Sequence, residues 1–218
     1  MIRNGTLAVI ATAVMTSIAS AASVDISFTN ITGNGNSDLS AQLNLNVAET
    51  GNASMIDFTF TNNIGIASSI AEIYFDDGNP TGSLFSAFIL AQSGTSFTYG
   101  SANPGDLPGG NAIADPFNVS DGFLADHGAK GPTTGINTAT DFVTIRATLM
   151  AGMGYADVLS RFDSGAMRVG LHVIGIDPQG GSDSYVTGGN PPPPVVPLPT
   201  TAAMGIVGMC GLASRRRR

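Results

Sequence analysis

Alternation of apolar and polar side chains in residues 39–47 constrains the fold more than any other feature of this sequence. Leu39, Ala41, Leu43, Leu45 and Val47 alternate with serine, glutamine and asparagine. Because successive side chains of a β-strand point to opposite faces, this pattern predicts a strand with one buried and one solvated face. Such a strand needs further strands to cover its apolar side.

Similar short apolar stretches recur at roughly ten-residue spacing, separated by glycine, asparagine, aspartate and proline, which is typical of antiparallel strands and turns. We expect strands within residues 24–29, 39–47, 55–61, 64–75, 84–90, 97–99, 143–149 and 167–173. Apolar residues at helical spacing predict one short helix near 154–163. Residues 100–140 are predicted to be a long loop region, and 167–173 the last strand before Asp177-Pro178. The expected fold is all-β, a jelly-roll-like β-sandwich with this one helix, covering residues 22–188.

The N-terminal 21 residues have the organisation of a secretory signal peptide. Arg3 lies in a short basic region, residues 6–18 are largely apolar, and Ala19 and Ala21 flank Ser20 as a small-residue cleavage site. We therefore expect export, with the mature chain beginning at Ala22.

The C-terminal 30 residues combine a stiff linker, an apolar segment and a basic end. Residues 189–195 include four consecutive prolines, which favour polyproline II. Residues 200–214 carry no charge, and the segment from Val195 is about long enough to span a bilayer. A buried core helix is the alternative, but such a helix would have a polar face. The positive-inside rule places the terminal arginines in the cytoplasm.

Residues 196–218 resemble the PEP-CTERM sorting signal of exported bacterial proteins, in which a short proline motif precedes an apolar helix and an arginine cluster. The family's usual motif has glutamate between the two prolines, where this chain has leucine. The resemblance implies transient anchoring in the inner membrane and processing by an exosortase, followed by transfer to the cell surface or extracellular matrix. The matching residues are Val196, Pro197, Leu198, Pro199, Arg215, Arg216, Arg217 and Arg218.

Residues 164–173 and 181–185 also resemble the ends of uncharacterised β-rich bodies found in proteins with this signal. That resemblance implies fold and family, and no activity.

The net charge of the body limits the kinds of partner that it can bind. Five of the nine basic residues are Arg3 and Arg215–Arg218, and all sixteen acidic residues lie between Asp25 and Asp183, so the body carries 4 − 16 = −12. An acidic body repels nucleic acid and anionic membranes, and we expect no nucleic-acid partner. The single cysteine, Cys210, excludes an intramolecular disulfide and a thiol nucleophile in the body.

The body offers little of what catalysis requires, and we expect no enzyme. Its two histidines, His127 and His172, have no Gly-x-Ser-x-Gly elbow or helix-borne histidine pair to complete a triad or zinc site. Paired carboxylates suited to a glycosidase are inevitable among sixteen acids and therefore prove nothing.

Calcium is the more reasonable ligand to consider. Asp76, Asp77 and Asn79 place hard oxygen ligands around Gly78 in a turn, and Asp115, Asp121 and Asp126 lie in the long loop region. The alternative is that these residues favour the turns themselves through side-chain to backbone hydrogen bonds.

Together these observations predict an exported surface or matrix protein of structural or adhesive type, associated with exopolysaccharide as the resemblance implies. The alternative is a carbohydrate-binding module, with or without calcium, whose residues 103–135 hold the ligand and bring Tyr99, Phe117 and Phe123 to one groove. A secreted hydrolase is a third hypothesis.

Overall fold

The computed structural model describes residues 21–34, 37–63, 65–78, 84–100, 105–125, 134–178 and 180–188. All of the predicted signal peptide except Ala21 lies outside this range, as do the linker and sorting tail of residues 189–218. Asn79, Asp126 and His127 lie outside it too.

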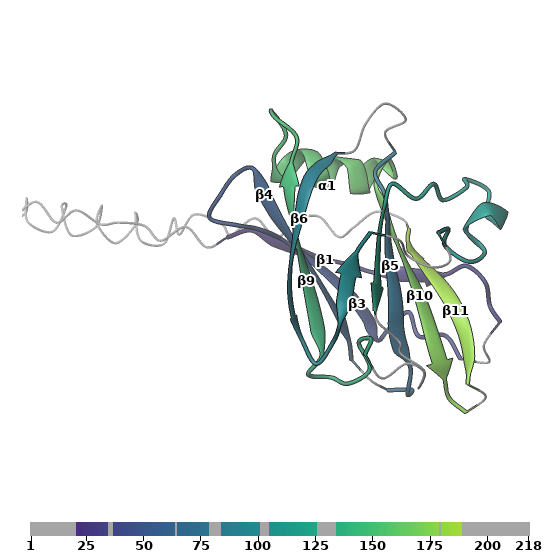
Figure 1. Ribbon diagram of the computed structural model, residues 1–218. Coiled ribbons are helices and arrows are strands. Elements are labelled where there is room, and N and C mark those ends of the chain that lie inside the picture. The colour runs from purple at the N-terminus through teal and green to yellow at the C-terminus, as the bar shows by residue number, and fades with distance from the viewer. Residues whose placement is uncertain are drawn as a thin grey trace, which may run out of the picture.

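The described residues form two antiparallel β-sheets and one α-helix (Figure 1), which confirms the prediction of an all-β body with a single short helix. The first sheet has five strands, in the spatial order β1 (Ser23–Ile26), β3 (Leu43–Glu49), β4 (Met55–Asn62), β9 (Phe142–Leu149) and β6 (Phe85–Ser93). The second has six, in the order β2 (Phe28–Asn30), β11 (Gly181–Thr187), β10 (Arg168–Ile176), β5 (Ser69–Asp76), β8 (Asp121–Ala125) and β7 (Phe97–Tyr99).

A phenylalanine cluster joins the two sheets. The ring of Phe75 on β5 packs edge-on against Phe58 on β4, with centroids 5.2 Å apart, and against Phe85 on β6 at 5.8 Å. Both Phe58 and Phe75 are fully buried. Perpendicular aromatic pairs add stabilisation beyond burial alone, so this cluster sets the separation of the sheets.

The helix α1 (Tyr155–Ser164) covers one end of the sandwich (Figure 1) and buries Val158 and Phe162. The Gly154 N–H donates to the Asp157 carboxylate at 2.8 Å at its start. Gly165 ends it with φ of 72°, a left-handed conformation that favours glycine.

Two predicted strands differ from the observed ones at their starts. Residues 24–29 form two strands, because the chain passes from the first sheet to the second at Ser27. Residues 39–42 precede β3 in a turn that leaves Ala41 exposed and buries Gln42. The Gln42 amide donates to the Asn62 side chain on the neighbouring strand β4 (2.9 Å) and to the Ile66 carbonyl (2.9 Å), so tertiary hydrogen bonds override the local alternation.

Two further strands were not predicted. Strand β8 lies inside the expected loop of residues 100–140, and the short helix η1 (Gly110–Ala112) lies there as well. Strand β11 follows Asp177-Pro178, so the prediction that 167–173 is the last strand is wrong. Strand β8 pairs with β5, which is distant in sequence, and β11 joins its preceding neighbour β10 to the distant β2.

Candidate functional site

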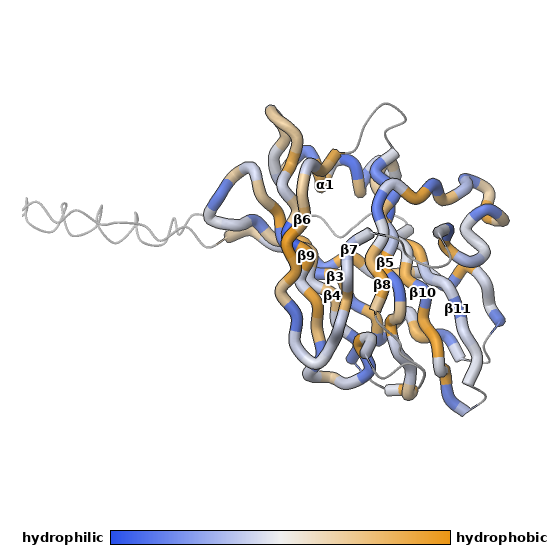
Figure 2. Tube along the Cα trace, in the orientation of Figure 1, coloured by the Kyte–Doolittle hydropathy of each residue, from blue (hydrophilic) through white to orange (hydrophobic). Residues whose placement is uncertain are grey.

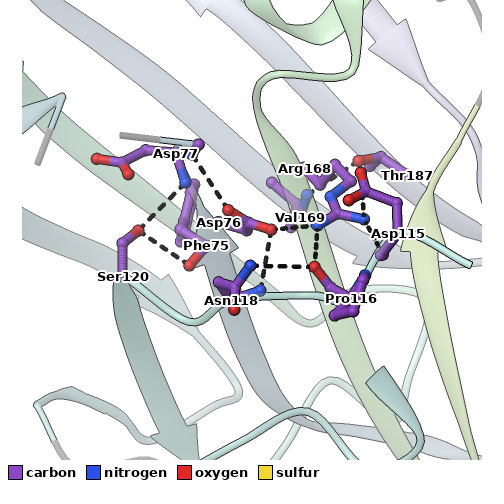
Figure 3. Close-up of polar contacts among 11 residues, drawn as sticks. Phe75, Asp76, Asp77, Asp115, Pro116, Asn118, Ser120, Arg168, Val169 and Thr187 are labelled. Atoms are coloured by element: carbon purple, nitrogen blue, oxygen red, sulfur yellow. Dashed lines mark hydrogen bonds and ion pairs between the residues drawn. The ribbon is translucent and has the colours of Figure 1, made fainter. Parts of the chain in front are cut away.

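Several charged side chains interact where β5 ends and β10 begins (Figure 3). Asp76 is the last residue of β5 and stands directly opposite Arg168, the first residue of β10. The Arg168 Nη2 lies 2.5 Å from the Asp76 Oδ2, and the two side chains are 13% and 6% exposed. We call Asp76, Arg168, Asp115, Pro116 and Asn118 the Arg168 cluster.

Both terminal nitrogens of Arg168 have acceptors in the segment that precedes β8. Its Nη1 donates to the Asp115 carbonyl at 2.7 Å and lies 3.3 Å from the Asp115 carboxylate. Its Nη2 also donates to the Pro116 carbonyl at 2.6 Å, and its guanidinium stands 5.4 Å from the centre of the Phe117 ring. The cation therefore fastens this segment to the outer face of the second sheet.

Asp76 completes the attachment from the other side. Its Oδ2 accepts the Asn118 N–H at 3.0 Å and its Oδ1 accepts the Gly78 N–H at 3.1 Å. Both oxygens are thus occupied by protein donors. Next to it, the Asp77 carboxylate accepts the Leu84 N–H at 2.5 Å, and the Asp77 carbonyl accepts from Arg161 of α1 at 3.2 Å.

A small apolar cluster also attaches the segment before β8 to the second sheet. Tyr74, Leu107, Phe117 and Val186 are buried together on the outer face of the second sheet. Gly170 makes room for them, since a Cβ there would lie 2.7 Å from the Leu107 Cδ2. Burial raises the pKa of the Tyr74 phenol well above its ordinary value.

A pocket of about 280 Å³ opens beside the Arg168 cluster, where the end of α1 meets β10 and β11. Asp115, whose side chain is 83% exposed, and Arg168 contribute its charged wall, and Phe162 and Met167 its apolar wall. The Arg168 Nη1 and Nη2 atoms already have oxygen partners, so an anion entering this pocket would have to compete with them.

The calcium candidates therefore play a different role in the described structure. The Asp76 carboxylate accepts the Gly78 N–H within its own turn, whereas the Asp77 carboxylate accepts the N–H of Leu84, seven residues further on. Both side chains are buried. Calcium binding by Asp76 would require the loss of its arginine. Within the described ranges, no group of three or more histidine, cysteine, aspartate and glutamate residues is arranged to hold a metal ion.

His172 lies on the outer face of the second sheet, as its place in the alternation predicts. Its Nδ1 contacts the Glu72 carboxylate on β5, its direct cross-strand partner, and its side chain is 16% exposed. Glu72 is only 4% exposed. The pair joins two central strands of the sheet.

The three aromatic residues expected to share one groove are separated. Phe117 packs under Arg168, whereas Tyr99 and Phe123 meet at the opposite edge of the second sheet with ring centroids 5.2 Å apart. Phe88 of β6 completes that second group, 4.9 Å from Tyr99. The Tyr99 hydroxyl donates to Asp121 at 2.9 Å, and burial together with this hydrogen bond raises the pKa of the phenol.

One feature of the sequence points to the Arg168 cluster. Arg168 is one of only four basic residues in the body, and it directly adjoins an apolar strand. A cation in that position needs an acidic partner when it is buried. Which of the sixteen acids provides it depends on the register of β5 and β10, which local sequence does not determine.

No helix in the described part of the chain combines the length and apolar character needed to cross a membrane. Comparison with known proteins adds no relative: no protein-family model, curated protein or solved structure matches this chain.

Proposed function

We propose that this protein is an exported, exosortase-processed component of the bacterial cell surface or extracellular matrix, with a structural or adhesive role and no catalytic activity. The observation that carries the proposal is the order of elements in residues 189–218: proline linker, Val-Pro-Leu-Pro motif, uncharged apolar segment and four terminal arginines. The signal-peptide pattern at the other end of the chain supports the same route.

The described body is consistent with a structural role. Arg168 with Asp76, His172 with Glu72 and Arg146 with Asp57 form contacts that join strands to one another or to a neighbouring segment.

We also propose that the body is a jelly-roll-like sandwich. Among the described strands, the chain passes from one sheet to the other seven times: between β1 and β2, β2 and β3, β4 and β5, β5 and β6, β6 and β7, β8 and β9, and β9 and β10. Repeated crossing of this kind wraps a long antiparallel ribbon into two layers, as in jelly rolls.

The sorting proposal is tested by replacing Arg215–Arg218 with serine in the full chain, expressed in a bacterium that has an exosortase. We expect the precursor to accumulate in the membrane fraction, detected as a slower-migrating band. A variant with four lysines keeps the charge and should be processed normally. Processing of the serine variant at the wild-type rate would contradict the proposal.

A carbohydrate-binding role is a second candidate, favoured by one observation: Tyr99 is 55% exposed, stacks against Phe88 and is held by Asp121. Exposed aromatic faces are suitable platforms for sugars. Binding to extracted exopolysaccharide would be measured with calcium and with chelator, for the wild type, Tyr99→Ala and the similarly exposed control Met150→Ala. Saturable binding lost only in Tyr99→Ala would favour this candidate, and no binding under either condition would leave the structural role.

A further inference from the structure

Strand β6 forms an unusual edge of the first sheet. It pairs with β9 on one side, and no described strand pairs with it on the other. Its nine residues include no charged side chain and no proline. Figure 2 shows the strand as a largely apolar stretch at the margin of the molecule.

The exposed apolar side chains of the described structure gather around this strand. Ile89 lies on β6 and is 59% exposed, the largest value among the large hydrophobic side chains. Tyr99 packs against Phe88 of β6, and Met150 donates its N–H to the Leu84 carbonyl just before β6. These three are the only exposed large hydrophobic residues among those described. Phe88 packs against the core and Ile89 faces the other side of the sheet, so the exposed apolar residues flank β6 rather than form one patch. Exposed apolar side chains beside an unpaired edge favour an interaction there.

The other three sheet edges are short. Strand β1 has four residues and carries Asp25, and β2 and β7 have three residues each. Short or charged edges protect a sheet from pairing with another chain. Strand β6 lacks both protections.

Two local features limit the open part of β6 to five residues. A register shift between Phe85 and Ala87 disturbs its start. At its end, the Gln92 side chain accepts the Phe97 N–H at 2.7 Å and donates to the Phe97 carbonyl at 3.2 Å, which ties this position to β7. Ala87–Ala91 remain in regular pairing with β9 on one side, and we call them the open edge.

The sequence of the open edge is nearly palindromic: Ala, Phe, Ile, Leu, Ala. Antiparallel pairing of two copies centred on Ile89 would place Ile89 opposite Ile89, Ala87 opposite Ala91, and Phe88 opposite Leu90. Each large side chain then meets a large one and each alanine meets an alanine. A two-fold axis through Ile89 gives both copies identical contacts, as an isologous dimer requires.

Charge at the contact itself does not oppose a second copy. Two bodies with a net charge of −12 repel each other at long range, but β6 brings no charged side chain to the contact. The cross-strand neighbour of Ile89 is Arg146, which is already neutralised by Asp57 at 2.7 Å. We propose that a second copy of this chain binds the open edge of β6, joining two five-stranded sheets into one continuous sheet.

Disulfide trapping in the full chain tests the register. On a Cys210→Ser background, an equal mixture of Ala87→Cys and Ala91→Cys is oxidised and compared with each variant alone. In the proposed register Ala87 faces Ala91 of the second copy, whereas two Ala87 residues lie four positions apart, roughly 13 Å. A disulfide needs Cα atoms within about 7 Å, so we expect roughly ten-fold more linked dimer in the mixture. A mixture of Ala87→Cys with Ser23→Cys, on the edge strand β1, provides the background level.

Adding Ile89→Lys to both chains of the productive pair should reduce the linked dimer to that background, because two lysines would then face each other on the two-fold axis. Ser23→Lys is the matched control and should leave the yield unchanged. Circular dichroism verifies that both lysine variants are folded. Equal yields from the mixture and the single variants, no linked dimer at all, or a yield unaffected by Ile89→Lys would each overturn the proposal.

Discussion

Arg168 and Asp76 face each other across β10 and β5, and their ion pair is also the point where the segment before β8 is attached to the sheet. The pair is almost fully enclosed, at 13% and 6% side-chain exposure. One contact therefore supports strand register and loop position together.

Removal of one member of this pair should destabilise the protein strongly. Arg168→Ala leaves the Asp76 carboxylate buried without its cation, and Asp76→Asn does the reverse. We expect each to lower the free energy of unfolding by about 3–5 kcal/mol, measured by urea denaturation. The double variant Asp76→Asn/Arg168→Ala should lose less than the sum of the two.

The ion pair of Arg146 and Asp57 is the natural control. It also joins two neighbouring strands, with distances of 2.7 Å, but Arg146 is 45% exposed. Because solvent screens an exposed pair, Arg146→Ala should leave the urea midpoint nearly unchanged. Equal losses for Arg146→Ala and Arg168→Ala would show that burial is not what gives the Arg168 pair its strength.

Gly170→Ala tests the packing of the segment before β8 against the second sheet. The new Cβ would lie 2.7 Å from the Leu107 Cδ2 and 3.2 Å from the Phe117 ring, so these side chains must move outward. We expect a loss of about 1–3 kcal/mol in unfolding free energy and faster proteolysis within residues 105–120. Gly51→Ala, where a Cβ meets nothing within 4 Å, should have little effect.

Gly165→Ala tests the end of α1 by a different mechanism. Its φ of 72° disfavours a side chain, yet a Cβ there meets no atom within 4 Å. The expected cost is therefore conformational, roughly 1 kcal/mol, and Gly165→Asn should recover part of it because asparagine tolerates this conformation. If both variants matched the wild type in thermal melts, the helix end would not need a left-handed residue.

Stability should fall at alkaline pH. Burial raises the pKa of Tyr74 and of Tyr185, so above pH of about 10 the unfolded chain loses phenolic protons that the folded protein keeps. The contribution is complete below that pH and disappears as pH rises towards the folded-state values. Urea titrations across this range should show a decline of up to about 1.4 kcal/mol per pH unit for each tyrosine. Tyr74→Phe should make the decline shallower, and an unchanged slope in this variant would contradict the assignment.

Local alternation predicted the parts of the fold whose burial pattern is regular. Strands β4 and β9 bury every second residue, and α1 buries Val158 and Phe162 at helical spacing. The pattern is visible in sequence because the burial of each residue follows from its own position in the element.

Strand β8 does bury every second residue, but one of these is Asp121, so the alternation is not visible as apolar and polar residues. Strand β11 lacks such a pattern for a physical reason. It buries Asp183 and Ser184 almost completely: the Asp183 carboxylate accepts from the Thr32 hydroxyl (2.8 Å) and the Asn34 N–H (2.6 Å), and the Ser184 N–H donates to the Thr32 hydroxyl (2.9 Å). Those partners lie about 150 residues away in the chain, so polar residues that read as a loop become the interior of a sheet. The same holds for the Arg168 cluster, whose members come from three separate segments.

Pairing of β2 with β11 also determines when the body can be completed. Asn30 and Tyr185 are register partners 155 residues apart, so β2 cannot pair within the second sheet until β11 has been synthesised. During synthesis or delivery from the N-terminus, β10 keeps an unsatisfied edge until β11 emerges. A chain interrupted before residue 181 would retain nearly all of its apolar core and yet lack β11. Without β11, the second sheet cannot be completed, because β2 would lose its pairing partner and β10 one of its two neighbours.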